Sequence, residues 1–254
     1  MQISGHMAIV TGGASGLGAA TVRHMVEKGA KVAIFDSDIG RAASVAAESD
    51  VFPVKTDVSD EGSVEAALTA AMNHFGQGPR MVVNCAGIAP AARVIDREGR
   101  LASTLFERTI RINLLGTYLV TSHAARAMMA LESLETAERG VIINTASVAY
   151  QDGQLGQAAY AASKGAVAAM ALPIAREFAR AGIRVMNIAP GLFHTPMMEG
   201  LPEDVTAKIT DNIPFPARLG DPREYALLAA QIIENPYLNG TTIRLDAAMR
   251  LPPR

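Results

Sequence analysis

The sequence predicts an α/β protein built around a doubly wound parallel sheet. Short, continuous apolar runs rich in Val and Ile alternate with longer helical segments along the 254-residue chain. Continuous apolar strands are typical of a parallel sheet that helices cover on both faces. Right-handed crossovers between such strands wind the sheet in both directions. No linker, repeat or low-complexity stretch interrupts the alternation, so residues 1–254 are predicted to form a single domain.

Seven apolar runs are expected to form the strands. Each is short, is rich in β-branched residues and is bounded by Gly, Asp, Pro or another small polar residue. The first of them enters a glycine-rich turn. The predicted strands are Met7–Gly12, Lys31–Asp36, Asp50–Asp57, Arg80–Gly87, Gly140–Ser147, Gly182–Gly191 and Thr241–Asp246.

The segments between these runs carry helical patterns. In one of them Val64, Leu68 and Met72 recur at intervals of four, which places them on one face of a helix. Only 191–215, rich in Met, Pro and Phe, breaks the alternation, and we expect it to form a lid over a binding site. The predicted helices are Gly16–Ala30, Arg41–Ser49, Asp60–Gly76, Leu101–Ala130, Gln157–Met170 and Asp221–Glu234.

Composition narrows the classes of function. The net charge is −2 and no run of Lys or Arg is present, so neither nucleic acid nor an anionic membrane surface is the expected partner. No leader segment and no uncharged apolar stretch long enough to span a bilayer is visible. The single cysteine, Cys85, cannot form an internal disulfide, and the five histidines lack the spacing of metal ligands. We therefore expect a cytoplasmic, metal-free protein that acts on a small molecule.

The first strand is followed by the turn TGGASGLG, which opens a helix. Gly12, Gly16 and Gly18 allow a tight turn, close approach of the backbone to a pyrophosphate, and close packing of the helix on the strand. The amino end of the helix presents N–H groups and a positive dipole end to phosphate. Ordinary βα turns also contain glycines, but the position between a strand and a helix in an open α/β chain favours a dinucleotide site.

Acidic residues after the second and third strands extend this site. Asp36 lies 18 residues beyond Gly18, where a carboxylate can accept hydrogen bonds from the adenosine ribose. It would also repel a 2′-phosphate, so the predicted cofactor is NAD rather than NADP. Asp57 and Val58 are placed to meet the adenine. Each aspartate could instead cap the helix that follows it.

Further motifs follow along the chain: NCAG at Asn84–Gly87, Asn113 in INLLG, Ser147 in NTAS, YAASK at Tyr160–Lys164 and PGLFHT at Pro190–Thr195. Together with the glycine turn they make the chain resemble the short-chain dehydrogenases/reductases over essentially its whole length. The resemblance implies a Rossmann-type sheet of about seven strands, a nicotinamide cofactor, and a homotetramer or homodimer.

Longer stretches are similar to a narrower group. GVIINTASVAYQDGQLGQAAYAASKG, IRVMNIAPGLFHTPM and IIENPYLNGTTIRLDAAMR resemble the type 2 3-hydroxyacyl-CoA dehydrogenases, also known as 17β-hydroxysteroid dehydrogenases type 10. The long insertion after the fourth strand, Ala89–Leu105, fits this group. The resemblance implies NAD-dependent oxidation of (S)-3-hydroxyacyl-CoA to 3-oxoacyl-CoA. The alternatives are a steroid or another secondary alcohol as substrate and, in a different class, an NAD-binding scaffold without turnover.

Tyr160 and Lys164 stand one helical turn apart, so both side chains project from one face of a helix. Oxidation of an alcohol needs a base, and a tyrosine of ordinary pKa is a poor one near neutral pH. A nearby ammonium favours the phenolate, and so does the positive charge of oxidised nicotinamide, so both Lys164 and the cofactor are expected to lower the pKa of Tyr160. Ser147 is expected to orient the substrate oxygen, and the resemblance adds Asn113 as the holder of a water linked to Lys164. Alone, a Tyr-x-x-x-Lys pair would indicate only a solvated helix face.

The remaining site residues follow from the resemblance. Two positions depart from the family pattern: Cys85 stands where many members have Asn, and His194 stands where a small residue is usual. Arg93, Arg97 and Arg100 of the insertion are candidate contacts for CoA phosphates. The expected cofactor contacts are Gly12, Ser15, Gly16, Leu17, Gly18, Asp36, Asp57, Val58, Cys85, Gly87, Tyr160, Lys164, Phe193 and Thr195. The expected substrate contacts are Ser147, Gln154, Leu155 and Tyr160, and Leu155, Phe193, Met197, Met198 and Leu201 could form an apolar wall. The alternatives are that Gln154 is a solvated loop residue and that the apolar side chains only pack within the lid.

Overall fold

The structure, a computed structural model, describes residues 1–47, 51–196, 210 and 212–253. Within this part of the chain lies one seven-stranded sheet in the order β3-β2-β1-β4-β5-β6-β7, and all neighbouring strands are parallel. The predicted doubly wound parallel sheet is confirmed. The strands are β1 (Met7–Thr11), β2 (Lys31–Asp36), β3 (Val51–Lys55), β4 (Pro79–Asn84), β5 (Gly140–Thr145), β6 (Ile183–Pro190) and β7 (Thr242–Leu245).

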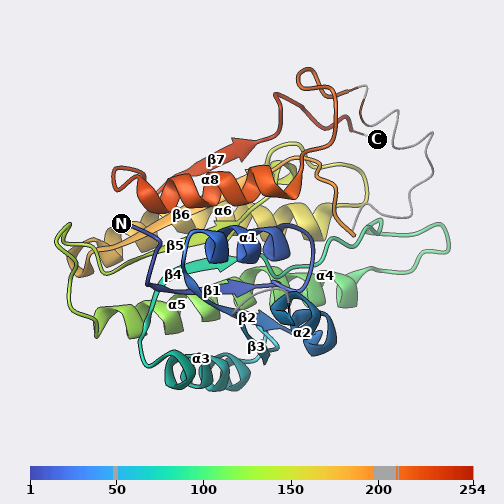
Figure 1. Cartoon of the computed structure of the whole chain (residues 1–254). Coiled ribbons are helices and arrows are strands. Elements are labelled where there is room, and N and C mark those ends of the chain that lie inside the picture. The colour runs from blue at the N-terminus through green and yellow to red at the C-terminus, as the bar shows by residue number, and fades with distance from the viewer. Residues whose placement is uncertain (48–50, 197–209, 211, 254) are drawn as a thin grey trace.

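Helices cover both faces of this sheet (Figure 1). On one face α1 and α8 lie side by side, with α2 beyond them, and on the other lie α3, α5 and α6. The helices are α1 (Gly16–Glu27), α2 (Ile39–Ala47), α3 (Glu61–Phe75), α4 (Ser103–Ile110), α5 (Gly116–Met129), α6 (Ala158–Phe178) and α8 (Pro222–Glu234), with 3₁₀ turns η2 (Val148–Tyr150) and η3 (Ala179–Ala181).

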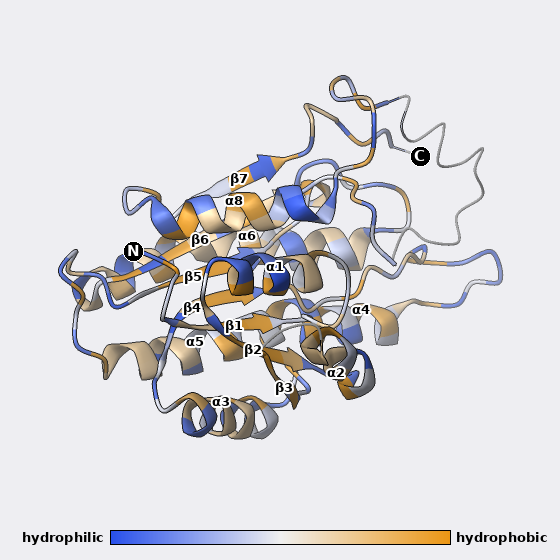
Figure 2. Ribbon diagram, viewed as in Figure 1, coloured by the Kyte–Doolittle hydropathy of each residue, from blue (hydrophilic) through white to orange (hydrophobic). Residues whose placement is uncertain are grey.

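Burial on both faces explains why the strands are continuous apolar runs. Alternate residues of a strand point to opposite faces, so a strand covered on both faces needs an apolar side chain at every position. In β1, Ala8 and Val10 enter the core shared with α1 and α8, whereas Met7 and Ile9 enter the core shared with α3 and α5. The central strands are accordingly hydrophobic between the two helical layers (Figure 2).

Three buried asparagines interrupt the apolar runs. Asn84 in β4, Asn144 in β5 and Asn187 in β6 stand opposite one another in register. Asn84 Nδ2 donates to Asn144 Oδ1 at 2.9 Å, and Asn144 Nδ2 donates to Asn187 Oδ1 at 3.3 Å. Asn187 in turn donates to the carbonyl of Val167 in α6 at 3.1 Å. Because a one-residue slip would carry an asparagine to the opposite face, this ladder holds the three strands in register.

The predicted helix Leu101–Ala130 is not continuous. A π-helical turn, η1 (Arg111–Leu115), separates α4 from α5, and Asn113 lies within it. A π turn inserts one extra residue into a helix and commonly occurs at functional sites. The residues remain helical on both sides, so the apolar pattern passes through the turn with little change. This is why the sequence pattern predicts one helix where the structure has three segments.

By length and composition, one helical stretch among the described residues, Ala158–Ala181, is apolar enough to cross a membrane. It is not uncharged, because it includes Lys164, Arg176 and Glu177. In the structure it packs against β6, η2 and α4, and the Lys164 side chain is buried within the protein. It is therefore a flanking helix of the sheet.

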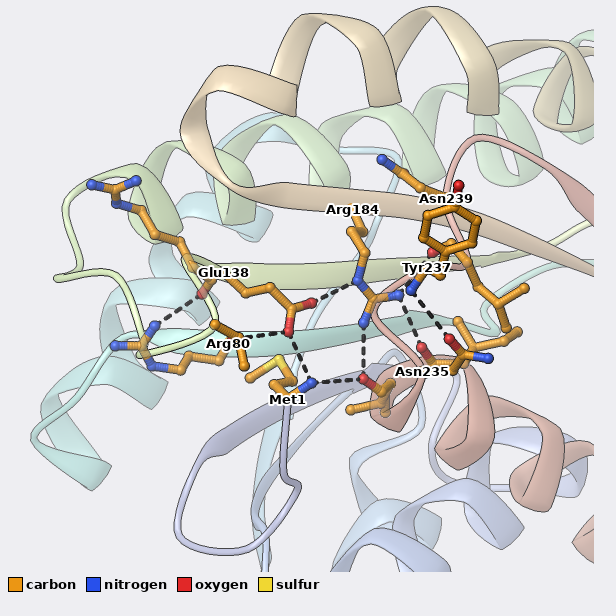
Figure 3. Close-up of polar contacts among 12 residues, drawn as sticks. Met1, Arg80, Glu138, Arg184, Asn235, Tyr237 and Asn239 are labelled. Carbon is orange, nitrogen blue, oxygen red and sulfur yellow. Dashed lines mark hydrogen bonds and ion pairs between the residues drawn. The ribbon is translucent and has the colours of Figure 1, made fainter.

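A buried ion cluster joins the start of the chain to β6 and α8 (Figure 3). Glu138 accepts hydrogen bonds from Arg184 Nε at 2.6 Å and from the Met1 amine at 2.9 Å. Arg184 also donates to the carbonyls of Ile232 and Ile233, which lie in the last turn of α8 and lack helical partners. Burial by itself raises the pKa of Glu138, but the hydrogen bonds from the amine and from Arg184 outweigh it and bring the pKa below its ordinary value.

Glu138→Gln removes this carboxylate charge and keeps the shape of the side chain. We expect the free energy of unfolding near neutral pH to fall by about 3 kcal/mol, because the buried Arg184 loses its charged partner. The folded-state pKa of Glu138 lies below its unfolded value, so its stabilisation is complete above the unfolded pKa and is lost as pH falls through the folded one. Urea denaturation of the wild type and the variant should show that the difference between their free energies of unfolding becomes smaller below pH 4.5. A difference that stays constant down to about pH 3 would contradict the assignment.

Candidate active site

The carboxyl ends of the parallel strands meet at one edge of the sheet, and predicted site residues gather there. The glycine turn follows β1, Asp36 ends β2, Cys85 follows β4 and Ser147 follows β5. In the sheet β1 lies between β2 and β4, so the direction of winding reverses beside β1. Open α/β sheets bind their ligands in the crevice at such a switch point.

The glycine turn makes close approaches that a side chain would block. A Cβ on Gly18 would clash with the Gly12 carbonyl oxygen, and one on Gly12 would lie 2.8 Å from the Ala86 backbone. A Cβ on Gly16 would lie 3.2 Å from the Thr195 side chain. The turn therefore contacts both the segment after β4 and the segment after β6. The structure brings Gly12, Gly16, Gly18 and Thr195 together as a cofactor site requires.

The amino end of α1 is open to an anion. Ser15 occupies the N-cap position, but among the described residues its side chain makes no capping hydrogen bond. The first N–H groups of a helix have no acceptor within the helix, so those of Gly16 and Leu17 are available to a phosphate. The side chain of Leu17 packs on the core instead of covering this end. Backbone donors, a helix dipole and the absence of a side-chain cap in this described turn fit a dinucleotide pyrophosphate.

Asp36 holds the glycine turn and does not cap the next helix. Its carboxylate accepts hydrogen bonds from the backbone N–H of Ala14 at 3.0 Å and of Asp38 at 2.9 Å. At the start of α2 it is Asp38 that accepts from the backbone N–H of Arg41, at 3.1 Å. The alternative role of Asp36 as a helix cap is therefore excluded. Each carboxylate oxygen can accept more than one hydrogen bond, so Asp36 retains capacity for ribose hydroxyls.

Asp57 and Val58 follow β3. Asp57 is exposed and accepts from the N–H and the hydroxyl of Ser59, at 2.9 Å and 2.7 Å. The cap of α3 is Asp60, which accepts a backbone N–H at 3.0 Å, so Asp57 does not cap that helix either. Val58 is buried, and its side chain packs where a Cβ on Gly116 would lie, at 2.7 Å. Because its side chain is buried, Val58 could contact an adenine only through its main chain.

Cys85 is partly buried next to the site. Its thiol accepts from the hydroxyl of Thr145 at 3.6 Å and donates to the hydroxyl of Tyr225 at 3.7 Å. Burial raises the pKa of the thiol, which keeps it neutral. Gly87 is exposed, and a Cβ there would lie 3.1 Å from Asn113 Oδ1. Gly87 has no side chain and the Cys85 thiol is engaged by Thr145 and Tyr225, so main-chain contacts are the ones expected from both residues.

The structure brings Ser147, Tyr160 and Lys164 together. Tyr160 and Lys164 lie in the first turns of α6, and the Ser147 hydroxyl, just beyond β5, lies near enough to Tyr160 to lower its pKa. Lys164 Nζ lies 5.8 Å from the centre of the Tyr160 ring and donates to the carbonyl oxygen of Thr145 at 2.7 Å. The Lys164 side chain is buried, whereas Tyr160 is partly exposed. The tyrosine hydroxyl is thus accessible beside a serine hydroxyl, above an enclosed cation.

Burial is the largest influence on the pKa values of Tyr160 and Lys164. It raises the pKa of Tyr160, against a hydrogen bond from Ser147 that lowers it. It lowers the pKa of Lys164 from 10.5 to about 8. The expectation that Lys164 lowers the pKa of Tyr160 is therefore not met by the protein's own groups, because the ammonium is directed to the Thr145 carbonyl. A phenolate at Tyr160 needs further positive charge nearby.

Asn113 connects the segment after β4 to α6, the helix that carries Tyr160 and Lys164, through hydrogen bonds. Its Oδ1 accepts from the backbone N–H of Ile88 at 2.8 Å, and its Nδ2 donates to the Ile88 carbonyl at 2.9 Å. Nδ2 also donates to the hydroxyl of Ser163 at 3.0 Å, next to Lys164. The carbonyl of Asn113 accepts from the Thr117 hydroxyl at 2.7 Å. A water held by Asn113 stays a prediction.

The segment after β6 presents Thr195, not Phe193, to the glycine turn. Phe193 is buried, and a Cβ on Gly220 would lie 2.6 Å from its ring. The exposed His194 donates its backbone N–H to the Gly220 carbonyl at 2.9 Å. Thr195 is partly buried and lies against Gly16. Of the two predicted nicotinamide contacts, Thr195 has its side chain beside the turn, whereas the Phe193 ring packs into the protein.

The predicted substrate residue Gln154 is engaged by the C-terminal segment. Its Nε2 donates to the Pro252 carbonyl at 3.0 Å, and its Oε1 accepts from Gln157 Nε2 at 3.4 Å. One of its two N–H donors is therefore engaged by the C-terminal segment. Its neighbour Leu155 is 62% exposed.

Part of the predicted lid, 191–215, lies outside the described residues, and so do Met197, Met198 and Leu201. The assignment of this segment as a lid stays a prediction. Among the residues that the structure describes, no group of three or more His, Cys, Asp or Glu is placed to hold a metal ion.

Sequence reasoning missed three residues that support the site. Thr145 provides the carbonyl for Lys164, and its hydroxyl lies 2.7 Å from the hydroxyl of the buried Tyr225. Thr145 is part of the NTAS motif, so a closer examination of the motif would have found it. Tyr225 in α8 and Arg244 in β7 are distant in sequence, and no local pattern indicates them.

The comparisons with known proteins agree with this geometry. A family model described as short chain dehydrogenase matches residues 6–206. The chain belongs to this family. Family membership and the Ser147, Tyr160 and Lys164 cluster make it an oxidoreductase that uses a nicotinamide cofactor.

Individual relatives cover nearly the whole chain. The 3-hydroxyacyl-CoA dehydrogenase type-2 of Bos taurus is 49% identical over 99% of this chain and 98% of its own length. The crystal structure of 3-hydroxyacyl-CoA dehydrogenase type-2 from Mycobacterium avium is 42% identical with a TM-score of 0.92, covering 98% of this chain and 97% of that one. The crystal structure of 3-ketoacyl-(acyl-carrier-protein) reductase from Brucella melitensis complexed with NADH is 28% identical in sequence, with a TM-score of 0.86. The match covers 98% of this chain and 100% of that one.

Lys164→Met removes the buried ammonium. Since the folded-state pKa of about 8 lies below the ordinary 10.5, the charged lysine destabilises the fold at neutral pH. We expect the variant to have a free energy of unfolding about 1–2 kcal/mol higher near pH 7, after allowance for the lost hydrogen bond. Between pH 8 and 10.5 the unfolded chain binds the extra proton, so the wild type gains stability and the difference shrinks. Denaturation of both proteins across this range checks the expectation, and a less stable variant at pH 7 would refute it.

Proposed function

We propose that this protein interconverts (S)-3-hydroxyacyl-CoA and 3-oxoacyl-CoA, with NAD as the cofactor. The observation that carries the proposal is the cluster of Ser147, Tyr160 and Lys164 at the sheet edge that also holds the glycine turn. These groups are what hydride transfer at a secondary alcohol needs. The acyl-CoA substrate is supported by the relatives named 3-hydroxyacyl-CoA dehydrogenase type-2, which are 49% and 42% identical to this chain.

In this reaction Tyr160 moves the proton. Its phenolate accepts the substrate hydroxyl proton during oxidation, and its hydroxyl gives a proton to the ketone oxygen during reduction. Ser147, which lies beside Tyr160, donates to the same oxygen and stabilises the charge that develops there. Lys164 adds a buried positive charge beneath the pair. When bound, the nicotinamide supplies the carbon that accepts or releases hydride, and the glycine turn with the amino end of α1 would hold its pyrophosphate.

An apolar rim beside the site favours a substrate with an acyl chain. Val94, Ile95 and Leu101 of the insertion and Leu155 of the loop before α6 are 66%, 57%, 70% and 62% exposed. The two segments are joined by a backbone hydrogen bond to the Gly156 carbonyl at 2.8 Å. Exposed apolar side chains gathered at one place commonly mark a ligand contact.

The insertion also offers positive charge for the CoA end of the substrate. It extends beyond the body of the sheet between β4 and α4 (Figure 1). Its residues line an open hollow of about 600 Å³. Arg93, Arg97 and Arg100 line this hollow. Arg100 is paired with Asp96 at 2.6 Å, so within this part of the described chain Arg93 and Arg97 are the better candidates for phosphate contacts.

Asp36 supports NAD over NADP. A carboxylate at the end of β2 would repel the 2′-phosphate of NADP. The next two residues are Ser37 and Asp38, and the nearest following cation, Arg41, is paired with Asp38 at 3.4 Å. This described segment therefore presents net negative charge to the adenosine ribose.

A steroid or another secondary alcohol is the second candidate substrate, because the apolar rim suits any hydrophobic molecule. A scaffold without turnover is disfavoured, since Ser147, Tyr160 and Lys164 are all present and clustered. The placement of the protein in the cytoplasm and a lid at 191–215 stay predictions.

We also propose that the chain self-associates as a homodimer or homotetramer through α4, η1, α5 and α6. Phe106, Leu115, Tyr118 and Leu172 on these helices are 44%, 37%, 49% and 45% exposed. Large apolar side chains exposed on neighbouring helices indicate a surface that another subunit covers. On α6, a Cβ added at Gly165 would meet nothing within 4 Å, which leaves room for a close helix contact.

Reduction of acetoacetyl-CoA tests the proposed reaction. We expect fast oxidation of NADH, little oxidation of NADPH, and a loss of about 10³-fold in kcat for Tyr160→Phe, because the variant has no proton to transfer. Asp36→Asn should reduce the ratio of the rates with NADH and NADPH by about tenfold, because it removes the repulsion between the carboxylate and the 2′-phosphate of NADPH. Tyr237→Phe, at a tyrosine that is 96% exposed, is the matched control and should keep full activity.

The outcomes separate the candidate substrates. No turnover of acetoacetyl-CoA by a protein that still binds NADH would reject the acyl-CoA proposal and direct the search to steroids and other secondary alcohols. Full activity of Tyr160→Phe would reject the assignment of Tyr160 as the acid and base.

The mass in solution tests self-association. Light scattering should give two or four times the chain mass of 26.7 kDa. Phe106→Glu should reduce that mass, because a charge would be placed within the apolar surface. A wild-type protein of one chain mass at micromolar concentration would contradict the proposed interface.

A further inference from the structure

The C-terminal segment 246–253, here called the tail, lies against the loop 151–157 that leads to α6. This loop is here called the substrate loop. The Leu155 backbone N–H donates to the Pro253 carbonyl at 3.1 Å, and the Gln154 side chain donates to the preceding carbonyl at 3.0 Å. On the other side, the Gly156 carbonyl accepts a hydrogen bond from the insertion at 2.8 Å. The substrate loop is thus held between the tail and the insertion.

A largely buried ion cluster anchors the tail and the substrate loop to each other. Arg244 in β7 donates to Asp152 Oδ2 at 2.6 Å and to Asp246 Oδ2 at 2.8 Å. The side chains of the three are 16%, 13% and 8% exposed. Arg244 also donates to Gln151 Oε1 at 2.8 Å and to the Met249 carbonyl at 3.2 Å. One planar guanidinium therefore binds the first residues of the substrate loop and two points of the tail.

The turn at the start of the tail has an unfavourable backbone conformation. Ala247 and Ala248 have φ angles of 49° and 61°, a left-handed conformation that residues with a Cβ rarely adopt. Such residues persist where surrounding contacts enforce them, often at functional sites. The turn directs Met249, which is 1% exposed, into a small core with Val148, the residue after the catalytic serine.

The substrate loop also lies directly against the helix of the catalytic pair. A Cβ on Gly153 would lie 3.3 Å from the side chain of Ala161 and 3.5 Å from the Ala149 carbonyl oxygen. Ala161 is adjacent to Tyr160 in α6. A shift of the substrate loop would therefore change the surroundings of the reacting groups, whereas the glycine turn lies on the other side of β4 and would be unaffected.

We propose that the tail is part of the substrate site and that Arg244 is a positioning residue for the reaction. Arg244 joins the tail to the substrate loop and so sets where Leu155 stands relative to Ser147 and Tyr160. The identity of the substrate rests on the proposed function, but the positioning does not. Loosening this contact weakens the binding of the substrate and leaves the binding of the cofactor intact.

A chain that ends at Arg250 tests the proposal, because it loses the two proline carbonyls and keeps the ion cluster. Arg244→Met removes the cluster, and Arg244→Lys retains the charge without the planar fork. Arg126→Met is the matched control, since it breaks an exposed pair with Glu65 at the α3–α5 contact. For each protein we would measure hydrogen exchange of the peptide 151–157, KM and kcat for acetoacetyl-CoA, the Kd of NADH, and the mass by light scattering.

For the shortened chain we expect about tenfold faster exchange in 151–157 and about tenfold higher KM, because the Leu155 amide loses its acceptor and the loop loosens. We expect kcat to stay within about twofold and the NADH Kd and the mass to stay unchanged. Arg244→Met should show a larger increase in KM, with Arg244→Lys between it and the wild type. Arg126→Met should match the wild type.

Unchanged exchange in 151–157 would show that the tail does not hold the loop and would overturn the proposal. Faster exchange with unchanged KM would overturn it too, because the loop would then lie outside the substrate site. A parallel loss of NADH binding or of mass would assign the effect to general structure and would also overturn it. If the wild type does not reduce acetoacetyl-CoA, the proposed function fails, while the exchange comparison still decides whether the tail holds the loop.

Discussion

The hydrogen bond from Lys164 to the Thr145 carbonyl, 2.7 Å long, is the contact on which the arrangement of the site depends. It joins α6 to the end of β5, and so it places two reacting groups at once. Tyr160 stands one turn before Lys164 on the helix, and Ser147 stands two residues after Thr145 on the chain. A charged donor in a buried setting makes a strong hydrogen bond, but the burial of the ammonium opposes folding. The site is thus maintained at the expense of stability, as is common where chemistry takes place.

Polar contacts, more than apolar packing, fix the position of α6. Its surface is rich in alanine, and small side chains provide few interlocking contacts that would prevent sliding. Lys164 binds β5, Ser163 binds Asn113 in the π turn, and the carbonyl of Val167 binds Asn187 in β6. Hydrogen bonds are directional, and a buried partner left unpaired is costly, so these three contacts specify one placement of the helix.

The two ends of the site are built differently. The cofactor side consists of backbone: glycines without side chains, an uncapped helix end and a carboxylate that supports the turn. The proposed substrate side consists of the insertion, the substrate loop and the tail, which bind one another through hydrogen bonds and one ion cluster. Backbone geometry suits a constant ligand such as a dinucleotide. Loops on a rigid sheet can vary without disturbing it, which suits selection among substrates.

The sequence by itself determined the sheet and the order of the elements, and it predicted the positions proposed to carry chemistry. Continuous apolar runs require burial on both faces, glycines in the first turn require close backbone approach, and the spacing of Tyr160 and Lys164 requires a common helix face. Tertiary structure alone decided the π turn at Asn113, the direction of the Phe193 ring, the engagement of Gln154 by the tail and the opposite pKa shifts of Tyr160 and Lys164. Each of these depends on groups that are distant along the chain, such as Pro252 or Gly220. Local patterns encode periodicity and backbone preference, whereas burial and long-range hydrogen bonds exist only once the chain has folded.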